Sequence, residues 1–405
     1  MSSVLPSATR VVSGMRATGR LHLGHYHGVL RNWVRLQNEY DCFFFVADWH
    51  ALTTHYEDPS IIAESVRDMV IDWLAAGVDF QSATLFVQSD VPQHAELHLL
   101  LSMITPLGWL ERVPTFKDQQ EKLRERDLAT YGFLGYPLLQ SADILAYRAA
   151  FVPVGEDQVA HIELCREVAR RFNYLYGREA GFLEKAEEAL RIMGRKAAKA
   201  YKDLREAYLE RGEKEALETA RALIERQANM TLGDKERLFG YLEGHGRLIL
   251  TEPQALLTPQ SRMPGLDGQK MSKSYGNIIG LREHPDEVAK KLKTMPTDPA
   301  RKRRTDPGNP DLCPVWPFHE IYSSEDVKTW VRNGCTSAGI GCLQCKQPVI
   351  DAINAELAPI RQRAQELEQD AAGVRTILAD GARRAREAAD ETLEDVRRAM
   401  GLAWD

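Results

Sequence analysis

Two short segments carry side chains that suit phosphate chemistry, although they lie far apart in the chain. Residues 22–25 read His-Leu-Gly-His, and residues 270–274 read Lys-Met-Ser-Lys-Ser. Imidazole N–H groups can donate hydrogen bonds to phosphate oxygens, and lysine ammonium groups can neutralise charge as a phosphate bond breaks. Taken singly, the first segment would be a pair of turn histidines and the second an exposed basic loop. Together they predict a site that holds a nucleoside triphosphate while pyrophosphate leaves.

The residues next to the histidine segment favour this interpretation. Residues 16–18 (Arg-Ala-Thr) follow the first predicted strand, and Gly24 opens the first predicted helix. A glycine permits close backbone approach, and unpaired amides at a helix N-terminus attract anions. Walker-type, GxSxG and HExxH patterns do not occur in the sequence. His94 and His98 have the i, i+4 spacing of metal ligands, but no third ligand is evident, so we interpret them as a solvated helix face.

Four of the six cysteines gather in one region of the chain. Cys313, Cys335, Cys342 and Cys345 lie within it, and the last two form a CxxC pair. Thiols clustered in this way predict a metal site, and their spacing suits either zinc or a [4Fe–4S] cluster. The other two cysteines stand alone among apolar residues, which predicts buried packing positions at 42 and 165.

The pattern of the remaining chain predicts an α/β protein. Short apolar runs at 11–15, 42–47, 83–88 and 151–154 are typical of strands, and helical periodicity fills 24–37, 60–76, 95–103 and 158–173. This alternation predicts a parallel sheet with helices on both faces, which binds ligands at the carboxyl ends of its strands. Residues 183–247 read as an insertion of three or four helices with breaks at Gly212 and Gly233, and their near-balanced charge favours a solvated helical hairpin over an RNA clamp. A long amphipathic charged stretch runs from 352 to 400.

Bulk properties limit the class of protein. The chain has 405 residues, a net charge of −6 and 44% hydrophobic residues. The length predicts two or three domains, and the charge argues against nonspecific coating of nucleic acid. Six cysteines are too few for a secreted disulfide scaffold. Without an apolar run long enough for a membrane span or a secretion signal, the sequence predicts a cytoplasmic location without membrane contact.

These motifs resemble the signatures of class I aminoacyl-tRNA synthetases, and the residues between them resemble the tryptophanyl family. The segments that carry the resemblance lie at 44–53 (FFVADWHALT), 136–137 (YP), 142–145 (ADIL) and 152–158 (VPVGEDQ). The resemblance implies a Rossmann-type catalytic domain, a helical anticodon-binding domain and a homodimer. It further implies ATP with Mg²⁺ as cofactor, and tryptophan attached to tRNA(Trp) as the product.

The resemblance also implies a role for particular residues. His22, His25, Lys270 and Lys273 would be catalytic. Tryptophan would contact His50, Gln140, Asp143 and Gln158. Asp143 is the strongest candidate, because its carboxylate could accept the indole N–H, and a carboxylate at a helix N-terminus is the less favoured alternative. Lys117 is a weaker candidate for phosphate contact. ATP would contact Arg16, Ala17, Thr18, Gly24, His25, Gly155, Glu156, Asp157, Met263, Lys270, Met271, Ser272, Lys273 and Ser274.

Two positions depart from the common pattern of the family. Arg16 stands where many relatives carry Gln, and Gln140 where many carry Met. Arg16 could reach phosphate or a substrate carboxylate, and Gln140 could supply a second polar contact to the indole.

The four cysteines resemble those of a subset of tryptophanyl enzymes with a [4Fe–4S] cluster in the anticodon domain, and zinc is the alternative. Beside them, the basic run at 301–304 is a candidate for contact with tRNA phosphates. The predicted domains are a catalytic domain at 1–182 and 248–290, a helical insertion at 183–247, and a helical anticodon-binding domain at 291–405.

Three alternatives remain open from the sequence. A tyrosyl-tRNA synthetase also places an Asp against an aromatic substrate. A small nucleotidyltransferase shares the HxGH chemistry, but it would lack the long helical C-terminal part. A non-catalytic RNA-binding synthetase paralogue would be expected to have decayed motifs, whereas both segments and Asp143 are intact.

Overall fold

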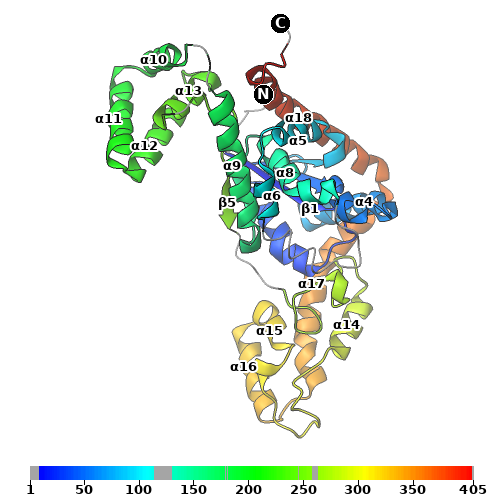
Figure 1. Cartoon of the computed structure of the whole chain (residues 1–405). Helices are drawn as coiled ribbons and strands as arrows, with labels where there is room; N and C mark the ends of the chain where they lie inside the picture. The colour runs from blue at the N-terminus through cyan, green and yellow to red at the C-terminus, as the bar shows by residue number, and fades with distance from the viewer. Residues whose placement is uncertain are drawn as a thin grey trace.

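A parallel five-stranded sheet forms the centre of the molecule (Figure 1). The computed structural model describes residues 9–113, 130–177, 179, 181–244, 246–257 and 263–403. The strand order is β3-β2-β1-β4-β5, and every pairing is parallel. The predicted α/β class and the four predicted strands are confirmed. The strands are β1 (Arg10–Arg16), β2 (Asp41–Ala47), β3 (Ala83–Val87), β4 (Phe151–Val154) and β5 (Gln254–Leu257).

Successive side chains of the strands pack alternately into two separate cores, one on each face of the sheet. Val11 and Phe44 pack into one core, whereas Val12, Phe43 and Phe45 pack into the other. This is the two-residue period of a strand buried on both faces. Helices α2 (Arg31–Leu36), α4 (Ser60–Ala76) and α17 (Cys342–Gln369) contribute to the first core. Helices α5 (Gln93–Ser102), α8 (Tyr131–Leu145), α9 (Val159–Tyr176) and α18 (Ala371–Ala399) contribute to the second.

The sheet opens between its central strand, β1, and the neighbouring strand β4. β1 pairs with β2 at seven successive positions, from Arg10↔Asp41 to Arg16↔Ala47. Its pairing with β4 is limited to Val11↔Phe151. The two strands therefore separate toward their carboxyl ends, at the place where the chain changes direction across the sheet. Ligands of doubly wound sheets bind at this switch point.

The insertion folds as an arm of four helices with its own core. It comprises α10 (Phe182–Met193), α11 (Arg195–Arg211), α12 (Lys214–Glu225) and α13 (Leu232–Leu242), and it projects from the sheet in Figure 1. Gly212 ends α11 in the left-handed conformation, as predicted. The break predicted at Gly233 is wrong, because Thr231 and Asp234 form a capping box and the helix continues through the glycine.

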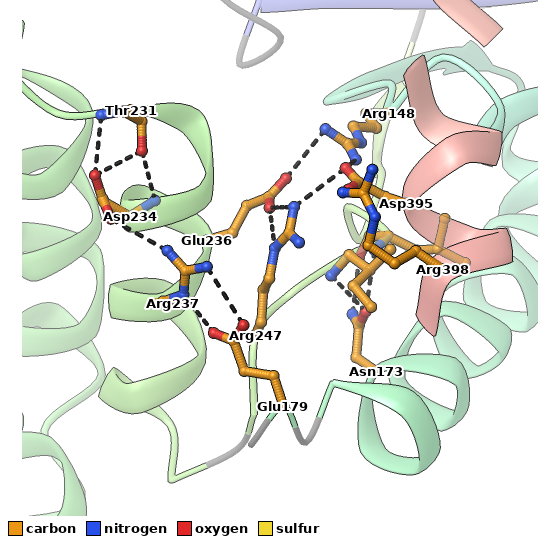
Figure 2. A network of polar contacts seen from close by, with 12 residues as sticks. Arg148, Asn173, Glu179, Thr231, Asp234, Glu236, Arg237, Arg247, Asp395 and Arg398 are labelled. Atoms are coloured by element: carbon orange, nitrogen blue, oxygen red, sulfur yellow. Dashed lines mark hydrogen bonds and ion pairs between the residues drawn. The ribbon is translucent and has the colours of Figure 1, made fainter. Parts of the chain in front are cut away.

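A buried ion network fixes the arm to the body (Figure 2). Arg148, between α8 and β4, contacts Glu236 of α13 at 3.0 Å and Asp395 of α18 at 2.5 Å. Arg247 contacts the same two carboxylates, at 2.5 and 3.1 Å. The amide oxygen of Asn173 also accepts hydrogen bonds from the backbone N–H groups of Ile249 and Leu250, just after the insertion. Segments far apart in sequence thus share one set of charges.

The chain after the sheet forms a second lobe and then returns to the sheet. The lobe contains α14 (Pro285–Thr294), η6 (Pro310–Leu312), α15 (Trp316–Tyr322), α16 (Glu325–Thr336) and the start of α17. The stretch at 352–400 is two helices, because Asp370 ends α17 and caps α18 through the Gly373 amide. A Cβ atom on Gly381 would lie 1.8 Å from the Leu85 carbonyl oxygen, so α18 rests directly on β3. None of the described helices could cross a membrane.

Candidate functional site

Two adjoining cavities lie where β1 and β4 separate. The outer cavity, of about 790 Å³, is lined by the His22–His25 turn and by residues 270–275. The inner cavity, of about 420 Å³, is lined by β1, by His50 and by Asp143. They share a wall made of His25, Val29, Pro153, Val154 and Gly155. A ligand in one cavity would therefore face a ligand in the other across the carboxyl ends of β1 and β4.

The histidine turn is held by its own side chains. His22 Nδ1 accepts from the Gly24 amide at 3.1 Å, and His25 Nδ1 accepts from the His22 amide at 3.3 Å. Helix α1 (Leu23–His25) continues as a π-helix, η2 (Tyr26–Leu30), and the Leu23 amide donates to Ile279. The expectation of unpaired helix amides at Gly24 is therefore wrong. Gly24 is needed instead because the His22 ring packs against it. A Cβ atom on Gly24 would lie 2.9 Å from the imidazole.

The two imidazoles are neutral donors. Burial, and then the Lys273 charge, lowers the pKa of His22 to about 4. Burial lowers the pKa of His25 well below its usual value, with His22 and Lys273 adding to the effect. Because each Nδ1 accepts a backbone N–H, each Nε2 carries the proton. The turn thus offers two neutral N–H donors, and the positive charge of the site comes from the lysine loop.

The lysine loop is folded onto the loop that follows β1. Lys273, in η5 (Lys273–Tyr275), donates to the carbonyl oxygens of Thr18 and Gly19, both at 2.8 Å. Burial lowers the pKa of Lys273 to about 8. The buried Asn277 holds the loop, accepting from the Ser272 amide and donating to the Lys270 carbonyl. This positioning residue was missed as a site residue in the sequence.

Asp143 closes the inner cavity and is bound by three donors. It accepts from His50 Nε2 at 2.7 Å, from Gln88 Nε2 at 2.7 Å and from His94 Nδ1 at 2.6 Å. Burial alone would raise the pKa of Asp143, but the His50 and His94 contacts outweigh it and hold the pKa well below its usual range. His94 Nε2 lies 2.6 Å from the Tyr147 hydroxyl, which can donate a hydrogen bond to it. One ligand N–H could still be added to the carboxylate.

One interpretation from the sequence is wrong here, and one alternative is excluded. His94 is fully buried against Asp143 and does not lie on a solvated helix face. Asp143 lies near the C-terminal end of α8, so it is not a carboxylate at a helix N-terminus.

Most of the remaining predicted site residues line either the outer or the inner cavity. Thr18, Met263, Met271, Ser272 and Ser274 line the outer cavity. Gln140 and Gln158 line the inner one, together with Tyr136, Thr53 and His161, which were not predicted to be site residues.

A few predicted positions lie elsewhere. Arg16 lines the inner cavity, not the outer, and donates to Thr54 at 2.5 Å. Ala17 is buried in the core, and Glu156, in η4 (Glu156–Gln158), is exposed. Lys117 and the side chain of Asp157 lie outside the described part of the chain.

The four clustered cysteines converge in the second lobe. Burial, and then the neighbouring thiols of Cys313, Cys335 and Cys342, raises the pKa of Cys345 to about 12. Cys345 Sγ also lies 3.4 Å from His319 Nε2. As the thiols stand, no three His, Cys, Asp or Glu side chains within the described ranges have the arrangement of a metal site. All six cysteines are free, and Cys42 and Cys165 are buried as predicted.

Arg301 is a structural residue of this lobe. Its guanidinium donates to the Ile340 and Arg304 carbonyl oxygens at 2.6 and 3.0 Å and lies 3.8 Å from Cys335 Sγ. The prediction that the whole run at 301–304 meets tRNA phosphates is therefore wrong for Arg301. The other three side chains of the run are exposed.

Comparisons with known proteins agree with this geometry. Residues 6–191 and 211–393 match the family described as tRNA synthetases class I (W and Y). The tryptophan–tRNA ligase of Ralstonia nicotianae is 67% identical over 98% of this chain and 99% of its own length. That of Thermotoga maritima is 44% identical over 98% of this chain and all of its own. The tryptophanyl-tRNA synthetase of Campylobacter jejuni, solved with ADP and tryptophan, has a TM-score of 0.72 at 25% identity, covering 97% of this chain and 100% of that one.

The chain therefore belongs to the class I tRNA synthetases of the tryptophan and tyrosine group. Within this group, its identity to the two full-length relatives assigns it to the tryptophan–tRNA ligases.

Replacement of His94 tests the Asp143 network. We expect His94→Leu to lower the free energy of unfolding by roughly 2–4 kcal/mol, because Asp143 and Tyr147 each lose a buried partner. His94→Asn, whose amide can replace the Nδ1 donor, should lose roughly half as much. Urea denaturation of the two variants measures the difference. Equal losses would contradict the donor role that we assign to His94.

Proposed function

We propose that the chain activates tryptophan with ATP in these two cavities and then transfers it to tRNA(Trp). The observation that carries the proposal is the shared wall, which brings the cavity lined by the histidine turn and the lysine loop against one lined by the buried Asp143 carboxylate. ATP would occupy the outer cavity between the histidine turn and the lysine loop. Tryptophan would occupy the inner cavity, with its carboxylate toward the shared wall.

The reaction needs no protein nucleophile. The tryptophan carboxylate attacks the α-phosphorus, a new O–P bond forms, and the α–β bridging bond breaks to release pyrophosphate. A terminal ribose hydroxyl of the tRNA then attacks the acyl carbon, and AMP leaves. Rate enhancement comes from positioning and from stabilisation of charge on the phosphates. The neutral Nε2–H groups of His22 and His25 would donate to phosphate or ribose oxygens, and Lys270 and Lys273 would neutralise the leaving group. Mg²⁺ would share the phosphate charge.

Tryptophan would be selected by the one hydrogen bond that its side chain can donate. The indole N–H would complete the acceptor capacity of Asp143, whose other bonds go to Gln88, His50 and His94. Gln140 lies one turn before Asp143 on α8 and would contact the same ring. An apolar substrate would leave the carboxylate without this donor, which a buried charge tolerates poorly.

Amino-acid-dependent exchange of labelled pyrophosphate into ATP tests the activity. We expect exchange with tryptophan and less than about 1% of that rate with tyrosine. Addition of tRNA(Trp) should then give charged tRNA. Exchange with tyrosine alone would identify the tyrosyl alternative, and no exchange with either amino acid would identify a non-catalytic paralogue.

The lowered pKa of Lys273 predicts the pH dependence of ATP activation. An ammonium group with a pKa of about 8 is mostly charged at pH 7 and loses its proton as the pH rises further. The kcat/KM for ATP in the exchange reaction should therefore fall about tenfold per pH unit well above pH 8. Lys273→Arg keeps its charge, so its residual activity should not show this fall. Lys273→Ala should abolish exchange while tryptophan binding, measured by calorimetry, persists. A fall in the Arg variant at the same pH would assign the titration to another group.

We further propose that Cys313, Cys335, Cys342 and Cys345 hold a [4Fe–4S] cluster as thiolates. The nearness of the other three thiols to Cys345 supports this, and the side chains would have to move to bind a metal, because the described residues do not form a metal-binding group as they stand. The cluster would join the start of α17 to α16 and to the segment before α15. His319, also bonded to Ser323, would donate a hydrogen bond to the Cys345 sulfur.

Metal analysis of anaerobically purified protein tests this site. We expect brown protein with iron and sulfide in near-equal amounts, and loss of the iron in Cys342→Ser. Cys165→Ser, at the cysteine buried in the sheet domain, should keep the iron. Colourless protein with one zinc per chain would reject the cluster and support the zinc alternative.

We also propose a location, an oligomeric state and a tRNA-binding region for the enzyme. Six free cysteines suit the reducing cytoplasm.

Leu99 of α5, Met103 directly after it and Leu107 at the start of α6 (Leu107–Glu111) are 55%, 67% and 58% exposed. These exposed apolar side chains support a homodimer, which sedimentation equilibrium would test. Residues 291–405 would bind the anticodon arm, with Lys302, Arg303 and Arg304 as candidates for phosphate contacts. This division into domains stays a prediction.

A further inference from the structure

The arm carries a concentrated positive charge at one end of α11. Between residues 189 and 202 the sequence contains five cations and no Asp or Glu, although the chain as a whole has a net charge of −6. All five side chains are exposed. They are Arg191, in the last turn of α10, and Arg195, Lys196, Lys199 and Lys202 of α11, and we call them the α11 basic face. The balanced charge of the whole insertion conceals this separation of charge in space.

These five cations differ from most others of the arm in having no partner. Arg221 contacts Glu243, Arg237 contacts Glu179, and Arg211 contacts Glu213 at 2.7 Å. Across the described part of the chain, no ion pair or side-chain hydrogen bond involves any of the five. Their ammonium and guanidinium groups therefore remain available to an outside anion.

The order of charges along α11 is opposite to the order that stabilises a helix. Cations stand in its first two turns, where the positive end of the helix dipole repels them, and Asp203, Glu206 and Glu210 stand in its second half. The opposite face of the helix is buried through Tyr201 and Ala207. The basic face therefore contributes nothing to the arm's own core and disfavours its own helix.

The α11 basic face also lies apart from the two cavities, since none of its residues lines either of them. The family match omits residues 192–210, which include four of the five cations. A role for this face would therefore concern a partner bound outside the two cavities.

We propose that the α11 basic face binds the sugar–phosphate backbone of the tRNA substrate, away from the site of the reaction. The proposal rests on the function proposed above, which supplies a polyanionic partner. Arg195, Lys199 and Lys202 follow one another at i, i+4 and i+7, so their Cβ atoms are about 5–6 Å apart from one to the next. A row of unpaired cations of this kind suits a row of phosphates. The buried opposite face leaves no apolar side for insertion into a lipid surface.

Removal of two charges from this face tests the proposal. We expect Lys199→Gln/Lys202→Gln to raise the KM for tRNA in aminoacylation by about fivefold or more, with tryptophan-dependent exchange unchanged. The dependence of log Kd for tRNA on log salt should become shallower by about 1–2. The melting temperature should stay equal or rise, because repulsion at the start of α11 is relieved.

Lys214→Gln/Arg226→Gln is the matched control, since it removes two exposed cations of the same arm that also have no ion-pair partner in the described structure. It should leave the KM for tRNA within twofold of the parent. An unchanged KM and salt slope in the α11 variant would overturn the proposal, as would an equal loss in the control. Loss of exchange in the parent protein would instead reject the proposed function.

Discussion

The limited pairing between β1 and β4 is the constraint on which the site depends. Val11↔Phe151 joins the two strands at their start, and beyond this pair they separate. Their separation leaves the backbone around Gly14 and Arg16 facing a cavity instead of a neighbouring strand. Pro153, which has no N–H to donate, lies in the opposite wall. A fully paired β4 would close the space in which both substrates must meet.

One side of the outer cavity is neutral, and the other side carries positive charge. The histidine turn is neutral, because burial and the nearby Lys273 oppose protonation of His22 and His25. Lys273 itself donates to the Thr18 and Gly19 carbonyl oxygens. A triphosphate would offer stronger, charged acceptors in place of these carbonyls. The loop can therefore exchange one set of bonds for another when the nucleotide arrives, with the ammonium already close to its position.

The sequence predicted what depends on local pattern and failed where tertiary contacts decide. The helix at 60–76 and the strand at 151–154 were predicted with the observed bounds, because their apolar periodicity is strong. His94 could not be recognised, since its role depends on Asp143 and Tyr147, about fifty residues away in the chain. Motif resemblance identified Asp143, but nothing local indicates its partners.

The sequence also does not show which side chains of a charged run point toward solvent and which are buried. Four cations in sequence at 301–304 look equivalent, yet one of them is folded inward against Cys335. The error at Gly233 is of another kind, because the capping pair of Thr231 and Asp234 was visible in the sequence and outweighs a glycine in the first turn.

The ion network at Arg148 shows how an appended arm can take part in substrate binding. Two arginines and two carboxylates join α13, α18 and the turn before β4; Arg148 and Glu236 are buried, and Arg247 and Asp395 are partly buried. Burying such charges is costly, and a hydrophobic contact of the same size would often be more stable. A charged network, however, is satisfied in one relative position of its elements only, whereas apolar surfaces can slide. The same turn that leads into the wall of the two cavities therefore also fixes the direction in which the arm projects. Any partner that binds the far helix of the arm is consequently held in a defined position relative to the site between β1 and β4.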